Sequence, residues 1–284
     1  MRTRYWQLKA LCEAVLSIVC LYHVPAQESR CLAIIPSFHD RLRTSGAEGP
    51  VQLSRQRFVV FVYPNAAAVY SEADFVNTSS ETFVQEFALP STGHNENGNA
   101  PGGRISTGIL NVQLQVQGKR IAPDFIKDGI EDWYTIRTPL APGEQQNVQA
   151  LFWAQTSLAD LDSLPGLDTV EIPDGRRGFM CDLAHGATWN SAISTIHIEV
   201  VLMQDLNIDP GSVSADPNTY EVQDSTFSWN LYNVEPSPDD NLFVWYSGIE
   251  NHKPEYNTMA KLSGYIVKTV YDNLLTYARM RDEE

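Results

Sequence analysis

Cysteine is scarce in this 284-residue chain, and its few cysteines form no metal-binding motif. Four are present, at positions 12, 20, 31 and 181, and no Cys-x-x-Cys pair occurs. A disulfide-framework fold and a cysteine zinc site of the usual spacing are therefore excluded. One bridge between Cys31 and Cys181 and two unpaired thiols both remain open. Cys181 lies in an alternating segment, which indicates a buried structural residue rather than a nucleophile.

Basic residues are also few, at 20 Lys+Arg against 35 Asp+Glu, a net charge of −15 at pH 7. A chain of this charge lacks the basic face that phosphates require, so we expect no nucleic-acid partner and no attachment to anionic lipid. Residues 1–57 carry 8 basic and 4 acidic residues, net +4, whereas 58–284 carry 12 and 31, net −19. This change coincides with the start of strand-like patterning at Arg57.

No apolar run is long enough to span a bilayer, which takes about 20 residues. The run Ala14–Tyr22 follows three basic residues and precedes Val24-Pro25-Ala26, the order of a secretory signal cleaved before Gln27. We therefore predict a signal-like segment over 1–26 and an extracytoplasmic protein that is secreted, periplasmic or associated with the cell envelope; a short buried helix is the alternative. Residues 27–56 show no period, which predicts a tether or disordered arm whose removal costs little stability.

Common catalytic motifs are missing as well. The sequence contains no G-x-S-x-G, H-E-x-x-H, P-loop or dinucleotide-binding glycine pattern. These absences lower the expectation of an enzyme without excluding one, and we expect no cofactor. Carboxylates are numerous, so a secreted carbohydrate-active hydrolase is the alternative function. Two carboxylates and an aromatic side chain about 5–10 Å apart in one concave site would support it.

From Arg57 onward, apolar residues recur with the period of two that is typical of strands. Leu110–Gln117, for example, alternates apolar residues with Asn or Gln, which gives one dry face and one wet face. Turn residues such as Gly118 separate these segments. The pattern predicts a mostly β fold with two antiparallel β-sandwich units, over 57–156 and 157–250, followed by a C-terminal α-helix. Two halves of one large β-structure are the alternative.

The C-terminal segment 251–284 changes to a period of three to four residues, which predicts a helix from about Thr258 to Arg281. Its apolar stripe must be covered, either by the β-body of its own chain or by a partner. We expect the first. The stripe consists of Leu262, Ile266, Val270 and Leu274.

Aromatic residues are the main candidates for a binding surface, because some side chains on alternating strands must face outward. Outward aromatics on a sheet can stack on sugar rings or anchor a protein partner. The alternative is that both faces are buried, one by another sheet and one by the C-terminal helix. The candidates are Trp133, Trp153, Trp189, Trp245 and Tyr246.

Two oxygen-rich segments are weak candidates for a calcium site. Asn95 and Asn97 lie in the loop 90–104, and Asp160 and Asp162 lie in the connection between the two predicted units. Calcium prefers such oxygen ligands, but the loop lacks the EF-hand spacing and Leu residues interleave the aspartates. A plain surface loop and a short amphipathic turn are therefore favoured, and we expect no metal site.

Three loose motifs give the chain a family resemblance. They are RFVVFVYPNAAAVYSEADFVNTS from Arg57, LAPGE from Leu140, and GATWNSAI from Gly186. Over residues 57–250 the chain resembles a bacterial family of exported β-sandwich proteins known as a domain of unknown function. Where such proteins tend to carry Gly-Pro after the tryptophan, this chain has Ser191-Ala192. The resemblance implies an extracytoplasmic sandwich and no known catalytic residue.

These observations together predict an exported, acidic, non-catalytic β-sandwich module. Its partner would be a protein or a glycan of the cell envelope or the extracellular space. The sequence does not specify the oligomeric state.

Overall fold

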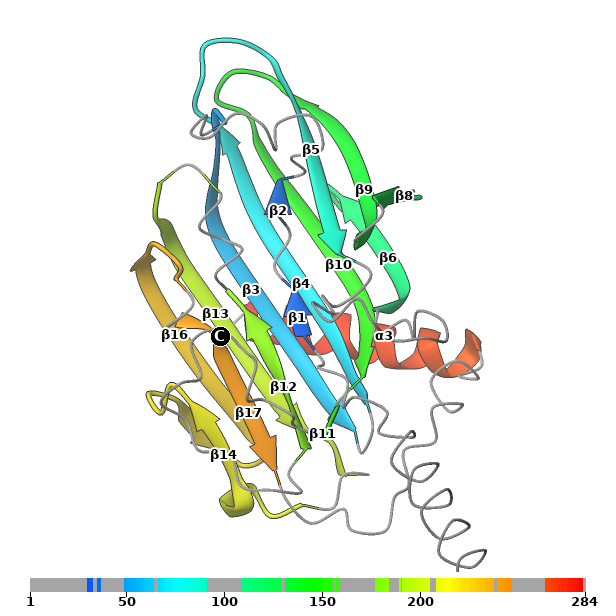
Figure 1. The fold of residues 1–284 in the computed structure, drawn as a ribbon, viewed down its shortest axis with the longest axis vertical. Coiled ribbons are helices and arrows are strands. Elements are labelled where there is room, and N and C mark those ends of the chain that lie inside the picture. Colours follow the sequence, from blue (N-terminus) through cyan, green and yellow to red (C-terminus); the bar gives the residue numbers. More distant parts are fainter. Residues whose placement is uncertain are drawn as a thin grey trace, which may run out of the picture.

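The computed structural model describes residues 30–32, 35–36, 49–63, 66–90, 109–128, 131–155, 157–158, 177–183, 189, 191–204, 208–237, 240–246 and 264–282. Strands dominate these segments, and one long α-helix, α3 (Gly264–Asp282), follows them (Figure 1). The predicted signal segment 1–26 lies outside the described residues. The strands are β1 (Arg30–Leu32), β2 (Ile35–Pro36), β3 (Val51–Tyr63), β4 (Ala66–Asn77), β5 (Phe83–Pro90), β6 (Leu110–Val116), β7 (Lys119–Ile121), β8 (Asp124–Asp128), β9 (Glu131–Leu140), β10 (Gln145–Gln155), β11 (Ser157–Leu158), β12 (Arg177–Asp182), β13 (Ile193–Leu202), β14 (Val213–Asp216), β15 (Glu221–Gln223), β16 (Thr226–Val234) and β17 (Leu242–Tyr246).

The described strands form three sheets. The largest has eight strands in the order β15-β16-β13-β3-β4-β10-β6-β7. A second contains β1-β12-β17-β14 with β11 beside β12, and a third has the order β2-β5-β9-β8. Figure 1 shows the two smaller sheets on one side of the large sheet. The architecture is therefore layered, with a wide central sheet.

The large sheet joins the two halves of the chain that the sequence separated at residue 156. β13 pairs in parallel with β3, from Thr195 opposite Arg55 to Leu202 opposite Val62. The prediction of a mostly β chain with a C-terminal helix is confirmed. Two of the three sheets are mixed, because each contains one parallel pair, β1 with β12 and β3 with β13, whereas the pairs of the third sheet are antiparallel. The two predicted sandwich units do not separate, because strands of both lie side by side in the large sheet.

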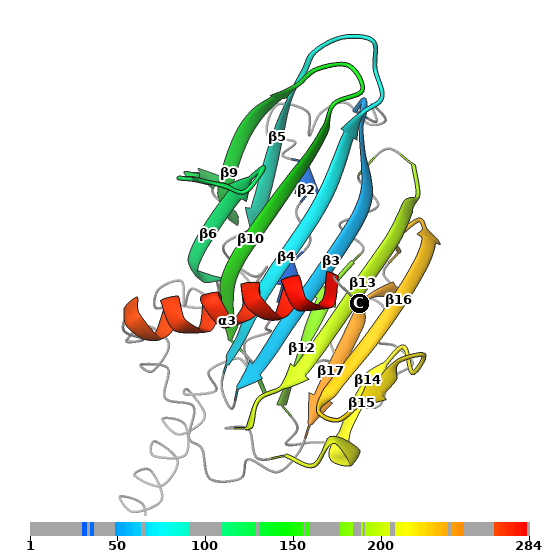
Figure 2. The ribbon, with the colours of Figure 1, turned by 180° about the vertical axis from the view of Figure 1, so that it is seen from behind.

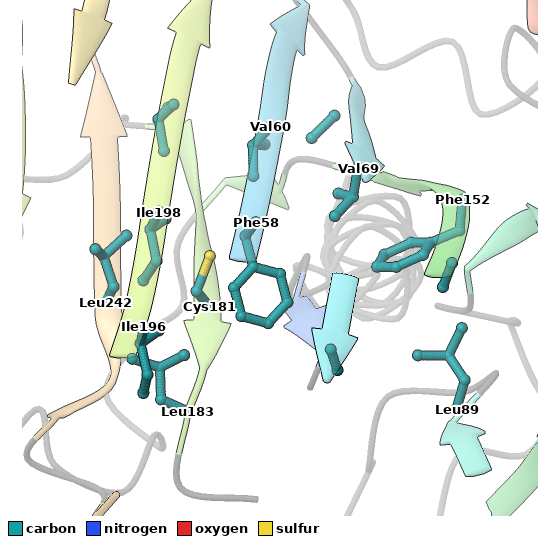
Figure 3. Close-up of a cluster of buried hydrophobic side chains, with 14 of the residues drawn as sticks. Phe58, Val60, Val69, Leu89, Phe152, Cys181, Leu183, Ile196, Ile198 and Leu242 are labelled. Carbon is teal, nitrogen blue, oxygen red and sulfur yellow. The ribbon is translucent and has the colours of Figure 1, made fainter. Parts of the chain in front are cut away.

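One apolar core fills the space between the large sheet and the two smaller sheets (Figure 3). β3, β4 and β13 contribute alternate residues from the large sheet, such as Phe58, Val69 and Ile198. The facing side chains include Leu89 of β5 and Leu242 of β17. Alternate residues are buried because a strand that packs on one face directs every second side chain toward that face.

The helix α3 covers the opposite face of the large sheet (Figure 2). It packs against β3, β4 and β10 and forms a second apolar cluster with them. The predicted cover by the chain's own β-body is therefore confirmed for Val270 and Leu274; the positions of Leu262 and the Ile266 side chain lie outside the described part of the chain. The helix residues of this cluster are Val267, Val270, Tyr271, Leu274 and Ala278.

β3 begins at Val51, which corrects the prediction of an arm over 27–56 for its last six residues. Val51 and Leu53 are buried in the main core, and two short strands, β1 and β2, also lie within this range. A register shift between Leu53 and Arg55 moves the inward positions from 51 and 53 to 56 and 58. This shift conceals the period of two, because it changes the phase of the pattern by one residue.

Candidate functional site

The aromatic candidates do not form an exposed surface. Trp153, Trp189, Trp245 and Tyr246 are each at most 8% exposed, and Trp133 is partly buried against the main core. The predicted outward orientation is thus wrong for the four buried residues, and the binding role of Trp133 stays a prediction. The physical reason for Trp153, Trp245 and Tyr246 is that both faces of β10 and β17 are covered at these positions.

The contacts of Trp189 and Trp153 show which parts of the molecule cover them. Trp189 packs against Phe75 with the two rings tilted and their centroids 4.6 Å apart, within the core between the sheets. Trp153 lies in the cluster beneath α3, with its ring 5.5 Å from that of Tyr63. Both are packing residues, and neither is available to a ligand at the surface.

The weak calcium candidates Asn95, Asn97, Asp160 and Asp162 lie outside the described residues. Within the described part, no group of three or more His, Cys, Asp or Glu side chains could hold a metal ion.

The polar residues of the large sheet instead gather on its outer face, beside α3. One row crosses five strands: Tyr232 of β16 is opposite Thr195, which is opposite Arg55, followed by Asp74 and Asn147. We call this set the polar row. Adjacent strands are about 4.8 Å apart, so the row is roughly 19 Å long. Tyr232 is 70% exposed at one end of it.

Charged and amide side chains on β3, β4 and β10 hold one another in place at the other end of the row. Arg55 donates from Nε to Asp74 at 2.7 Å, and its guanidinium lies 3.6 Å from Glu72. The Asn147 amide donates to both carboxylates, at 2.9 Å to Glu72 and 2.7 Å to Asp74, and Gln149 donates to Glu72 at 3.1 Å. Planar groups fixed in this way are preorganised to bind a polar ligand without a large entropic cost.

A buried ion pair lies next to the polar row, under the C-terminal part of α3. Arg57 and Glu199 are 4% and 2% exposed, and their side chains are 3.3 Å apart. Arg57 also donates to the backbone carbonyl of Ala278 at 3.0 Å. Glu199 in turn is 3.1 Å from Arg281 and accepts from the Tyr277 hydroxyl at 3.4 Å. The pair therefore attaches the end of the helix to β3 and β13.

His197 extends this cluster toward solvent. Its Nε2 is 3.5 Å from Glu199, and its Nδ1 is 2.6 Å from the Asn230 side chain. Burial raises the pKa of Glu199, but the hydrogen bonds and charges of His197 and Arg57 outweigh it, so the net pKa is below its ordinary value. Glu199 is thus an ionised structural acceptor and does not suit the role of a general acid.

The amino-acid sequence alone did not predict the polar row. Its members come from positions 55, 74, 147, 195 and 232, so only the strand order brings them together. The available signal was the alternation itself, as in Asn147 and Gln149, which marks one wet face without showing which strands adjoin.

No protein-family model and no curated protein matches the chain. Among solved structures, it is similar to one from Legionella pneumophila named a "putative nutrient binding protein", at 14% identity and a TM-score of 0.57, with 86% of this chain and 82% of that chain covered. This similarity shows a shared fold. An M1 zinc metallopeptidase from Deinococcus radiodurans matches at 14% identity and a TM-score of 0.41, over 72% of this chain. The chain spans only 44% of that peptidase.

A transmembrane helix is not found in the described segments, since none of their helices combines the necessary length with sufficient apolarity.

Proposed function

We propose that this protein is an exported, non-catalytic module that binds an extracellular or cell-envelope partner, and that a glycan is the partner its surface fits best. The observation that carries the proposal is the polar row, which aligns an exposed aromatic ring with fixed amide, carboxylate and guanidinium groups. Sugar hydroxyls both donate and accept hydrogen bonds, as these groups do. The exposed ring of Tyr232 offers an apolar face against which a sugar ring can pack.

The net charge of −15 supports a neutral or cationic partner over a polyanion. Arg55 does not change this preference, because Glu72 and Asp74 neutralise it locally. The signal-like start and the resemblance to exported sandwich proteins support the extracytoplasmic location. A protein partner and the hydrolase are the alternatives that the experiments must separate.

Glycan binding is tested with the purified chain on an array of neutral and amino-sugar polysaccharides. We expect at least one polysaccharide to bind, and Tyr232→Ala to weaken that binding about tenfold, equivalent to about 1.4 kcal/mol. Phe125→Ala is the matched control, because Phe125 is also an exposed aromatic, at 47%, but lies on β8 in another sheet. Equal binding by both variants, or no binding by the unmodified chain, would overturn the proposal.

The non-catalytic part is tested by incubating the same polysaccharides with the chain and measuring their length. Unchanged chromatograms are the expected result, and the appearance of shorter sugars would favour the hydrolase. Export is tested by N-terminal sequencing from an export-competent host, where the mature chain should begin near Gln27. Intact Met1 in the soluble cytoplasmic fraction would contradict export.

A further inference from the structure

Strand β1 is held on its sheet by a very short ladder. It pairs in parallel with β12 through three residues: Arg30 opposite Met180, Cys31 opposite Cys181 and Leu32 opposite Asp182. Cys31 and Cys181 are therefore register partners at the middle of this ladder. They are also the only two cysteines that remain if the chain is cleaved before Gln27.

The backbone spacing of this pair suits a covalent bond. Neighbouring strands lie about 4.7–4.9 Å apart, and the Cα atoms of a disulfide are usually about 4.4–6.8 Å apart. Cys181 is fully buried. Figure 3 shows it beside Phe58 and Ile198, in the core that β12 helps to enclose.

We propose that Cys31 and Cys181 form an intramolecular disulfide that fastens β1 to β12 in the oxidised protein. Two thiols lose two protons and two electrons as one S–S bond forms. A small-molecule or protein disulfide accepts the electrons and is reduced to two thiols, through a mixed disulfide with one of the two cysteines. The bond itself does not depend on the proposed export. Its cellular location does, because disulfides persist in oxidising compartments.

The disulfide would keep β1, a strand of three residues, paired with β12. Three ladder pairs offer little protection against fraying at a sheet edge, and chain termini open easily unless they are tied down. The bond would close a loop from residue 31 to residue 181, across most of the large sheet. It would thereby restrict the unfolded chain and keep the first residues of a chain cleaved before Gln27 on the β-body.

The test uses the full chain purified under reducing conditions, then oxidised with glutathione disulfide. Free thiols are alkylated, and the protein is digested and analysed by mass spectrometry. We expect linked peptides containing Cys31 and Cys181, and a melting temperature several degrees above that of the reduced chain. Both features should disappear in Cys31→Ser and persist in Cys20→Ser, the matched control from the predicted signal segment.

Alkylation of both Cys31 and Cys181 after oxidation, or dimers linked through Cys31, would overturn the proposal. A second arm separates this result from the export question by alkylating intact cells before fractionation. An exported chain with both thiols alkylated contradicts the bridge and leaves export standing. A cytoplasmic chain that forms the bridge only on oxidation in vitro contradicts export and supports the bridge.

Discussion

Glu199 shows how one carboxylate connects two layers of the molecule. It is nearly inaccessible to solvent, and it contacts Arg57 on a neighbouring strand and Arg281 on the helix. A buried charge is tolerated only when it is paired and hydrogen-bonded, which these contacts achieve. Removing the carboxylate would take the charge of Glu199 away from the buried Arg57 guanidinium.

We therefore expect Glu199→Gln to lower the free energy of unfolding by about 3–5 kcal/mol. Urea denaturation at pH 7 measures this loss. Asp272→Asn is the matched control, because the Asp272 carboxylate is mostly exposed and pairs with Lys268 at the surface of α3. Exposed pairs contribute about 0–1 kcal/mol. Equal stabilities for the two variants would contradict the role given to Glu199.

The same residue predicts a pH dependence. Its pKa is lower in the folded chain than the ordinary 4.5, so the folded state binds a proton less readily than the unfolded state. The stabilisation is complete above pH 4.5 and is lost as the pH falls through the lowered value. The difference between the unmodified chain and Glu199→Gln should consequently shrink below pH 4.5. Denaturation midpoints between pH 3 and 7 measure it, and a constant difference would contradict the assignment.

A substitution at Leu53 tests whether β3 begins at Val51, earlier than the sequence predicted. Leu53 is fully buried in the main core, within a range where the sequence predicted an arm. Leu53→Ala should cost about 2–5 kcal/mol, because it leaves a cavity among packed side chains. Gln52→Ala, one residue earlier and outside the apolar core, is the control and should cost much less. If Leu53→Ala melted at the same temperature as the unmodified chain, the result would contradict the packing of Leu53 and support an unstructured arm.

At the scale of elements, the helix α3 depends on its contact with the large sheet. Val270 and Leu274 face the side chains of β3, β4 and β10, and burying such a side chain contributes about 1.5–3 kcal/mol. Val270→Asp should therefore destabilise the monomer by several kcal/mol. Thermal melting and sedimentation on the same variant measure stability and association together.

Asn273→Asp is the matched control for this experiment, because it adds the same charge on the exposed side of the same helix. It should leave the melting temperature almost unchanged. If Val270→Asp also melted normally but no longer self-associated, the stripe would serve a second copy rather than the sheet.

The positions of the strands were largely predictable from the sequence, whereas the order in which they pair and the elements that cover them were not. Apolar patterning predicted strands at β10, β13 and β16, since each is long enough to show a period. It missed β14 and β15, which have only four and three residues and hold too few repeats to show a period. The aromatic candidates failed for a related reason. Periodicity assigns a side chain such as Trp153 to a face, but it does not show that a helix more than 100 residues later covers that face.

At the scale of the whole molecule, the main core determines how the chain unfolds. Residues of both predicted units, such as Phe58 and Ile198, lie in one apolar cluster, and β3 and β13 share one hydrogen-bonded ladder. A division at residue 156 would expose both the cluster and the edge of β3. The structure thus favours one cooperative unit over two independent domains.

We expect a single calorimetric transition in which the van't Hoff and calorimetric enthalpies agree. Phe58→Ala and Ile198→Ala, one from each predicted unit, should lower the same transition temperature. Two separate transitions, each sensitive to only one of these substitutions, would indicate two domains instead.

The parallel pairing of β3 with β13 also bears on the order of events during synthesis. β3 is complete once Tyr63 has been made, but its partner on one side arrives with residues 193–202. Until then one edge of the strand has no native neighbour, and a contact of such long sequence separation forms slowly because a large loop must close first. A nascent chain that cannot finish its central sheet early stays extended for longer, and this delay would suit the export that we propose, because a chain must thread a translocation channel before it folds.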